Sequence, residues 1–262
     1  MNKQPIGVFD SGIGGLSVLR ELYKRLPNED YIFFADQKNV PYGEKSKEEL
    51  VALTKNIMRF LKEKNIKMAV VACNTATCYA IEEMRAAFDM PIVGTVPAIK
   101  FAAEATKTGN IGLIATPATA SSQYVSDLVE KYAPEHNVLK IGCFGLENAV
   151  ETGQLVSDST TEILNQYILP LKGKNIDQLV LGCTHYPFLR PQIAEILGPM
   201  VSLVDSGDAV ARRVESILLE KGMTNGEGTS ATEFFTSNDA EFFSKVASQL
   251  LERSIEGRLA AL

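Results

Sequence analysis

Short apolar runs alternate with amphipathic helical patterns along almost the whole chain. Leu50, Leu53, Ile57, Phe60 and Leu61, for example, recur at the spacing of one helix face. Alternation of this kind predicts an α/β fold in which parallel sheets are flanked by helices. The expected strands are residues 6–10, 31–35, 68–73, 92–94, 111–115, 138–143, 179–182 and 201–204, with a late edge strand at 232–236.

The two halves of the chain carry similar patterns. Residues 8–12 with their following helix resemble residues 113–117, and apolar runs ending at Cys73 and Cys183 follow in the same order. The segment after residue 207 is too short for a core of its own, so we expect it to pack on the first half. We therefore expect two similar open parallel-sheet α/β domains related by pseudo-two-fold symmetry, with the active site in the cleft between them. The expected domains are residues 1–97 plus 208–262 and residues 98–207.

Composition narrows the class of protein. The chain has 262 residues, 45% of them hydrophobic and 22% charged, and a net charge of -6, which argues against nucleic acid as the main partner. It has neither an apolar stretch of about 20 residues nor a signal-peptide pattern, so we expect a cytoplasmic protein without a membrane partner. Four cysteines without a C-x-x-C pair and two histidines predict neither a disulfide scaffold nor a metal site.

Cys73 and Cys183 are the strongest candidates for chemistry. Each ends an apolar run and precedes small polar residues and a helix-like stretch, which puts it at the carboxyl end of a strand and at a helix start. Exposed N–H groups at a helix start favour a thiolate. Two thiols facing each other across one pocket can remove a proton from one face of a carbon and return one to the other face. That is the chemistry of a racemase without a cofactor.

The alternative is that both cysteines are small buried core residues, which is commoner for a lone cytosolic cysteine. The matched context of Cys73 and Cys183 argues against it. Cys78 and Cys143 lack that context, and we interpret them as structural. His185 can act as a general acid or base, or be a helix N-terminal residue with local hydrogen bonds; we expect His136, in a polar turn, to be solvated.

Two loops and one acidic residue can contribute to binding. The loop at 10–17 lacks the third glycine of a dinucleotide site and the Gly-Lys-Ser/Thr of a P-loop. It presents backbone N–H groups and Asp10 to a small anionic substrate, unless it is a plain glycine-rich turn. Pro41 and Gly43 predict a fixed turn around Tyr42. Glu151, at the end of a helical stretch, contacts a substrate ammonium or is solvated.

Several segments together closely resemble glutamate racemase, within the aspartate/glutamate racemase superfamily. They read VFDSGIGGL at 8–16, PYG at 41–43, ACNTA at 72–76, VETG at 150–153 and LGCTHYP at 181–187. The first and the last are specific to that enzyme, whereas the wider superfamily shares mainly the paired cysteines.

The resemblance implies a homodimer that interconverts L- and D-glutamate without pyridoxal phosphate or metal. It also implies that the enzyme supplies D-glutamate for bacterial peptidoglycan. It implies that Cys73 takes the proton from the D-enantiomer and Cys183 from the L-enantiomer, assisted by Asp10 and His185 respectively. The expected substrate-binding residues are Asp10, Ser11, Pro41, Tyr42, Gly43, Asn74, Thr75, Thr116, Thr119, Glu151, Thr184 and His185.

Two other classes of protein remain open at this point. One is an enzyme that uses a single thiol, such as a decarboxylase or an isomerase. The other is a two-lobed binding protein that holds a small anion. Some relatives with an extended amino terminus depend on a peptidoglycan-precursor activator; five residues precede the first expected strand here, so we expect no such dependence.

Overall fold

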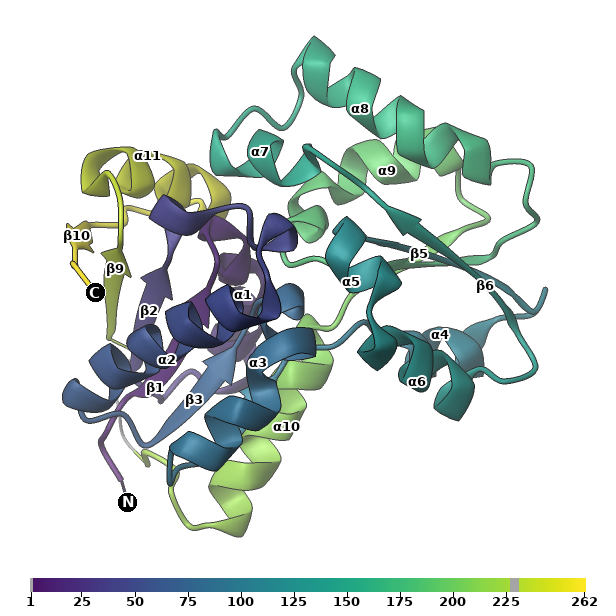
Figure 1. Ribbon diagram of the computed structural model, residues 1–262. Coiled ribbons are helices and arrows are strands. Elements are labelled where there is room, and N and C mark those ends of the chain that lie inside the picture. The colour runs from purple at the N-terminus through teal and green to yellow at the C-terminus, as the bar shows by residue number, and fades with distance from the viewer. Residues whose placement is uncertain (1, 227–230) are drawn as a thin grey trace. The chain divides into compact units, whose positions relative to one another are not determined.

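The computed structural model describes residues 2–226 and 231–262, in which the chain forms two compact units. Unit 1 comprises Met1–Thr95 and Gly207–Leu262, and unit 2 comprises Val96–Ser206. Each unit is a parallel sheet with helices on both faces (Figure 1). This confirms the predicted fold class of two parallel-sheet α/β structures.

The sheet of unit 1 has the strand order β10-β9-β2-β1-β3-β4, and its neighbouring strands are parallel. β1, β2 and β3 are buried along their whole length, as expected for continuous apolar runs covered on both faces. The strands are β1 (Ile6–Asp10), β2 (Tyr31–Ala35), β3 (Met68–Val71), β4 (Ile92–Gly94), β9 (Thr232–Thr236) and β10 (Gly257–Leu259).

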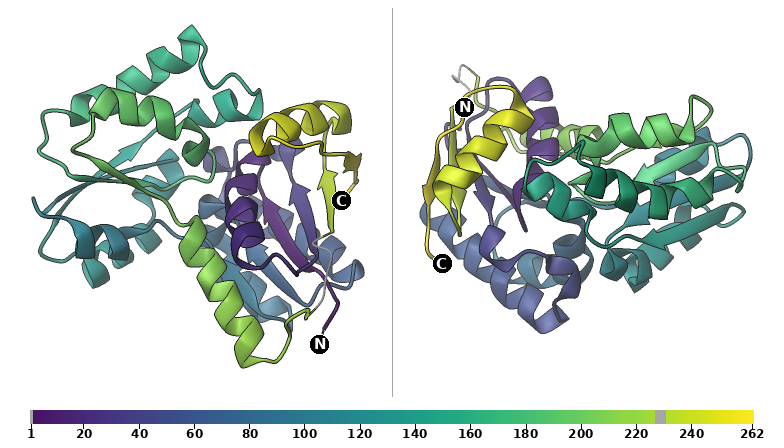
Figure 2. Two further views of the ribbon diagram at one scale, coloured as in Figure 1. Left: turned by 180° about the vertical axis from the view of Figure 1, so that it is seen from behind. Right: turned by 90° about the horizontal axis from the view of Figure 1, so that it is seen from above.

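Helices cover both faces of this sheet. α2 and α3 pack together on one face, and α1 packs with α10 and α11 on the other (Figures 1 and 2). The helices of unit 1 are α1 (Leu16–Arg25), α2 (Lys47–Glu63), α3 (Asn74–Ala87), α10 (Gly207–Glu220) and α11 (Ala240–Leu251). Its short 3-10 segments are η1 (Ile13–Gly15), η2 (Gln37–Asn39) and η3 (Tyr42–Glu44).

Unit 2 repeats the central part of this topology. Its sheet has the order β6-β5-β7-β8, which corresponds strand by strand to β2-β1-β3-β4 of unit 1. α7, α8 and α9 lie on one face and α4 and α6 on the other (Figure 1). The strands are β5 (Asn110–Ala115), β6 (Asn137–Gly142), β7 (Gln178–Leu181) and β8 (Ser202–Val204). The helical segments are α4 (Ile99–Ala105), α5 (Pro117–Ser121), α6 (Gln123–Tyr132), α7 (Leu146–Glu151), α8 (Asp158–Ile168), η4 (Leu169–Leu171), η5 (Tyr186–Leu189) and α9 (Arg190–Leu197).

The structure differs from the predicted elements at a few strand ends. The strand expected at 68–73 ends at Val71, because Cys73 already serves as the N-cap of α3. The strand expected at 138–143 spans Asn137–Gly142. β10 was not predicted, because it is three residues long and two of them, Arg258 and Leu259, are exposed, so no apolar run marks it.

The segment after residue 207 packs on the first part of the chain, as expected. β9 pairs with β2, and α10 packs against α1. A buried ion pair joins Lys67 Nζ to Glu29 Oε2 at 2.5 Å, and Lys67 also donates to the carbonyl of Met223 at 2.8 Å. The other oxygen of Glu29 accepts the N–H of Asn225 at 2.8 Å, so this pair ties the returning segment to the strands.

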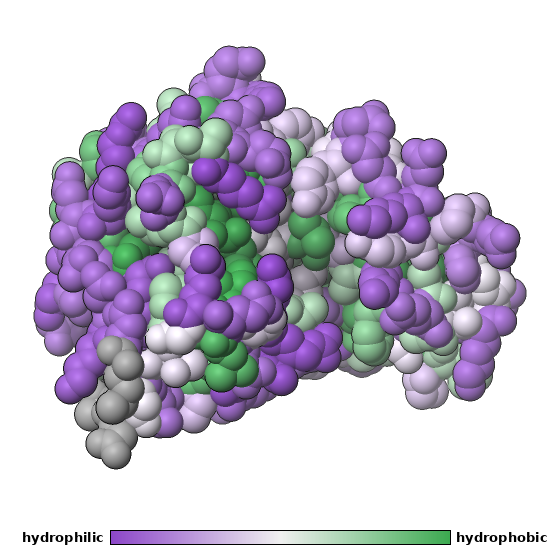
Figure 3. Space-filling view, turned by 90° about the horizontal axis from the view of Figure 1, so that it is seen from below, coloured by the Kyte–Doolittle hydropathy of each residue, from purple (hydrophilic) through white to green (hydrophobic). Residues whose placement is uncertain are grey.

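Polar side chains predominate on the face of the molecule that Figure 3 shows. Hydrophilic residues cover most of the face drawn in Figure 3, and the hydrophobic residues there lie in small patches between them. Within the residues that the structure describes, none of the helices has both the length and the apolar character needed to cross a membrane.

Two glycines allow close packing near the candidate residues. A Cβ at Gly15 would lie 2.6 Å from Asp10 Cβ and 3.1 Å from Phe33 Cε2. A Cβ at Gly182 would lie 2.8 Å from Leu113 Cδ1 and 3.0 Å from the carbonyl oxygen of Ile114. The glycine-rich loop after β1 therefore serves close packing against Asp10, which a larger residue would displace.

We expect Gly15→Ala to lower the free energy of unfolding by about 1–3 kcal/mol, the usual cost of overpacking a dense core. Urea unfolding measures this. Gly173→Ala is the matched control, because a Cβ at Gly173 meets nothing within 4 Å. Equal unfolding midpoints for the two variants would show that the loop can move away from Asp10 at little cost.

Candidate active site

The first group of candidate residues lies at the carboxyl edge of the sheet in unit 1. β1 and β3 are parallel neighbours, with Phe9 paired to Val71, and the N–H of Ala72 donates to the carbonyl of Phe9 at 2.8 Å. The residues that follow the two strands therefore lie together: Cys73 Sγ is 3.6 Å from Ser11 Oγ. Asp10 is buried, and its Oδ2 accepts the N–H of Gly12 at 3.2 Å.

Cys73 occupies the N-cap of α3. Its Sγ accepts the N–H of Ala76 at 3.4 Å, and the residue is only 5% exposed. The positive end of the helix dipole and this N–H stabilise a thiolate. Asn74 and Thr75, the first residues of α3, are buried beside it, and the Asn74 amide donates to the carbonyl of Thr95 at 3.2 Å. The prediction that Cys73 lies at a helix start is confirmed.

The loop after β2 contains a polar cluster centred on Asp36. Asp36 is fully buried and accepts the phenol of Tyr42 at 2.7 Å on Oδ2. Burial, followed by the charge of Asp36 and its hydrogen bond, raises the pKa of Tyr42 well above its usual range, with smaller contributions from Cys73 and Asp10. Tyr42 is therefore a neutral donor near the thiol. Pro41 and Gly43 flank it, half-buried, as the predicted turn requires.

The second group lies at the carboxyl edge of the sheet in unit 2. Cys183 and Thr184 follow β7, and Thr116 follows β5, its parallel neighbour. The N–H of Gly182 donates to the carbonyl of Ile114 at 2.7 Å, which brings the two strand ends together. Thr116 caps α5: its Oγ1 accepts the N–H of Thr119 at 3.2 Å and donates to Thr119 Oγ1 at 3.0 Å.

A line of three buried side chains supports the second thiol. His185 Nε2 lies 2.6 Å from Glu151 Oε1, and His185 Nδ1 lies 3.6 Å from Cys183 Sγ. Burial opposes the charged imidazolium of His185, but hydrogen bonds to Cys183 and Glu151 and the charges of both outweigh it and raise the pKa of His185 well above 6.5. An imidazolium held in this way, in contact with the Cys183 sulfur, is placed to exchange a proton with it.

The expectation of a helix start was wrong for Cys183. η5 (Tyr186–Leu189), a 3-10 segment, follows the turn after this cysteine, and α9 begins only at Arg190. Cys183 therefore has the His185 imidazole as its partner where Cys73 has a helix N-terminus. The solvated alternative for Glu151 was also wrong, because that side chain is buried against His185.

Cys143 and Tyr186 lie close to Cys183 and are fully buried. Burial, then the charges of Cys183 and Glu147, raises the pKa of Cys143 to about 12, so it remains a thiol at neutral pH. This supports its structural interpretation. Sequence reasoning missed Glu147 and Asp36. Asp36 could have been found, because it directly follows a predicted strand at the same edge as Asp10.

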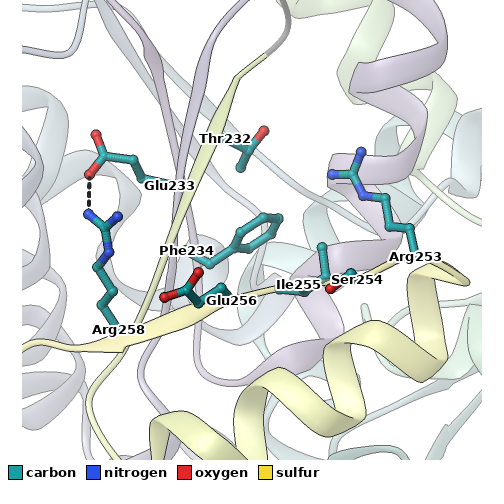
Figure 4. Close-up of a pocket in the computed structure, with 8 residues that line it drawn as sticks. All are labelled: Thr232, Glu233, Phe234, Arg253, Ser254, Ile255, Glu256 and Arg258. Carbon is teal, nitrogen blue, oxygen red and sulfur yellow. Dashed lines mark hydrogen bonds and ion pairs between the residues drawn. The ribbon is translucent and has the colours of Figure 1, made fainter.

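A cavity of about 310 Å³ in unit 1 lies elsewhere, beside β9 and β10 (Figure 4). Among the described residues that line it, none is a predicted site residue. Both of its arginines are already engaged: Arg258 pairs with Glu233 at 3.4 Å, and the Arg253 guanidinium lies 4.4 Å from the ring centroid of Tyr23. The two cysteine-containing groups remain the better candidates for chemistry.

Comparisons with known proteins agree with these motifs. The family model for Asp/Glu/Hydantoin racemase matches residues 6–214. A glutamate racemase of Herpetosiphon aurantiacus is 44% identical over 247 residues, which are 94% of this chain and 97% of that protein. The solved glutamate racemase of Bacillus anthracis matches with a TM-score of 0.93 and 32% identity, over 100% of this chain and 99% of that one. That of Francisella tularensis, solved in complex with D-glutamate, matches with a TM-score of 0.86 and 30% identity, over 100% and 98%.

We expect Glu151→Gln to lower the pKa of His185, because the variant removes the carboxylate that favours the imidazolium. NMR titration of the imidazoles measures this, and His136 is the internal reference, since the chain has two histidines.

The same pair makes stability depend on pH. The pKa of His185 is raised in the folded state, so its contribution is present in full below 6.5 and is lost as the pH rises through that raised value. Glu151→Gln should therefore destabilise the protein more at low pH than at high pH. An unchanged His185 titration in this variant would contradict the role given to Glu151.

Proposed function

This chain belongs to the Asp/Glu/Hydantoin racemase family, and we propose that it interconverts L- and D-glutamate with Cys73 and Cys183 as two acid/base residues. On this proposal neither pyridoxal phosphate nor a metal takes part. The choice of glutamate as substrate is supported by the relatives, which are glutamate racemases at 39–44% identity over most of their length.

One observation carries the proposal: two similar sheets each present a buried cysteine after the same strand. Cys73 follows β3 next to β1, and Cys183 follows β7 next to β5, in sheets of matching strand order. Each thiol also lies beside a positive group: the N-terminus of α3 for Cys73, and the His185–Glu151 pair for Cys183. A binding protein would need neither of these groups beside a thiol, and a one-thiol enzyme would need only one.

The proposed reaction balances with two thiols. For L-glutamate, the Cys183 thiolate takes the α-proton and becomes a thiol, and the Cys73 thiol gives its proton to the opposite face of the α-carbon and becomes a thiolate. For D-glutamate the roles are exchanged. Asp10 assists Cys73 and His185 assists Cys183 by holding or accepting the proton between turnovers.

The α-proton of an amino acid is weakly acidic, so the developing carbanion needs electrostatic stabilisation. The N–H groups at the start of α3, near Asn74 and Thr75, and the hydroxyl of Ser11 suit the α-carboxylate, where charge accumulates. Pro41, Tyr42 and Gly43 contribute a fixed turn. In unit 2 the hydroxyls of Thr116, Thr119 and Thr184 suit a carboxylate, and Glu151 an ammonium group.

The named relatives are bacterial proteins, which supports a biosynthetic role. We propose that the D-glutamate formed supplies peptidoglycan synthesis in the cytoplasm. Loss of this activity should make growth of the source cell depend on added D-glutamate, which a depletion strain tests.

The direct test is circular dichroism of L-glutamate incubated with the purified protein in deuterated water without added cofactor. We expect the signal to decay to zero while deuterium appears at the α-carbon. Incorporation of deuterium without inversion would instead support a one-thiol enzyme. No change, with L-aspartate also inert, would support a binding protein.

We expect Cys73→Ser and Cys183→Ser each to lower the racemisation rate by about 100- to 10,000-fold, the usual contribution of a general acid or base. Enantiomers have equal free energies in water, so kcat/KM must fall equally in both directions. Slow exchange of the substrate α-hydrogen with solvent distinguishes the roles of the two cysteines. The Cys73→Ser variant should catalyse this exchange only in L-glutamate, and the Cys183→Ser variant only in D-glutamate.

Cys78→Ser is the matched control for these variants. Cys78 lies on α3, five residues after Cys73, and is half-buried, so its loss should leave the rate unchanged. Residual two-way turnover in Cys73→Ser at the level of the control would contradict the two-base mechanism.

A further inference from the structure

We infer that Ser237, in the returning segment of the chain, is a positioning residue for the substrate-binding loop at residues 36–43. This inference rests on the proposed function, because it takes Tyr42 and Gly43 to contact the substrate. Ser237 belongs to none of the motifs that the sequence singles out, and it lies 201 residues from its partner Asp36.

Strand pairing explains how these distant residues meet. β9 and β2 are parallel neighbours with Ala35 opposite Thr236. The next residue along each strand, Asp36 and Ser237, therefore emerges at the carboxyl edge of the sheet, the edge that also carries Ser11 and Cys73. The N–H of Ser237 donates to the carbonyl of Ala35 at 3.0 Å, which continues the ladder to this point.

The hydroxyl of Ser237 bonds the loop in two ways. It donates to Asp36 Oδ1 at 2.7 Å and accepts the backbone N–H of Lys38 at 3.0 Å. The neighbouring Thr236 Oγ1 donates to Gln37 Oε1 at 2.9 Å. The returning segment thus holds three consecutive loop residues.

Asp36 transmits this contact to Tyr42. Its carboxylate is fully buried, and Oδ2 accepts the Tyr42 phenol at 2.7 Å while Oδ1 accepts the Ser237 hydroxyl. The Asn39 amide bridges the two oxygens at 3.0 Å each. A buried carboxylate depends on such donors, so loss of the serine hydroxyl would favour rearrangement of the carboxylate and of Tyr42 with it.

A second serine of the same segment provides the control. Ser248 in α11 donates to the carbonyl of Ser244 at 2.6 Å and accepts the N–H of Ile255 at 2.9 Å. Like Ser237 it is half-buried and makes two short hydrogen bonds, but its partners lie within the returning segment. Ser248→Ala therefore reports the general cost of losing a serine there.

Hydrogen exchange of the protein without substrate is the first measurement. We expect Ser237→Ala to speed exchange of the Lys38 amide by about tenfold, consistent with the loss of one hydrogen bond and loosening of a charged partner. Ser248→Ala should leave the loop amides unchanged. Unchanged exchange across residues 36–43 in Ser237→Ala would overturn the inference.

Steady-state kinetics is the second measurement. We expect Ser237→Ala to raise KM for both enantiomers by about five- to tenfold with kcat changed less than about twofold, the pattern of lost substrate binding. Ser237→Thr retains the hydroxyl and should restore KM. An equal rise of KM in Ser248→Ala, or faster exchange with no rise of KM in Ser237→Ala, would also overturn the inference.

The two proposals fail in different ways. If the unaltered protein does not racemise glutamate, the proposed function is wrong, and the exchange of the Lys38 amide alone decides whether Ser237 holds the loop. If the unaltered protein racemises glutamate and Ser237→Ala behaves like Ser248→Ala, the function stands and the positioning role is wrong.

Discussion

Parallel pairing of β1 with both β2 and β3 is the constraint on which the first group of candidate residues depends. Neighbouring parallel strands end at the same edge of the sheet. Residues at the ends of these strands therefore lie close together even though they are far apart in the sequence. Asp10, Asp36 and Cys73 meet for this reason, and β9 adds Ser237 to the same edge. The sheet core fixes the strand ends, and the strand ends fix the polar side chains.

The two units use this geometry differently. Cys73 is the N-cap of a long helix, where the backbone N–H groups of the first turn supply a positive potential. Cys183 precedes a short 3-10 segment, and its positive neighbour is instead His185, which is paired with the buried carboxylate of Glu151. A helix terminus carries a fixed partial charge, whereas an imidazole can gain or lose a proton. The two cysteines thus occupy corresponding positions in the two sheets but differ in the chemistry of their partners.

Local sequence patterns predicted most of the fold. Buried parallel strands appear as continuous apolar runs, and in helices the apolar residues recur at the helical spacing. These patterns missed β10, whose Arg258 and Leu259 are exposed, and misjudged the turn after Cys183, where the helix starts late. The cysteines were identifiable from their repeated context. The contacts of Glu151 with His185 and of Ser237 with Asp36 were not, because they depend on packing between segments that lie 34 and 201 residues apart.

Unit 1 is assembled from two stretches of chain with the whole of unit 2 inserted between them. During synthesis on the ribosome, β2 is therefore exposed along one edge until β9 has been made, and the ion pair of Lys67 with Glu29 lacks its contacts to Met223 and Asn225. Unit 2 is continuous in sequence and needs no later residue to complete its sheet. The order of translation thus completes the His185-containing half first, and the Cys73-containing half acquires its last strands, β9 and β10, only after the whole of unit 2 has been made.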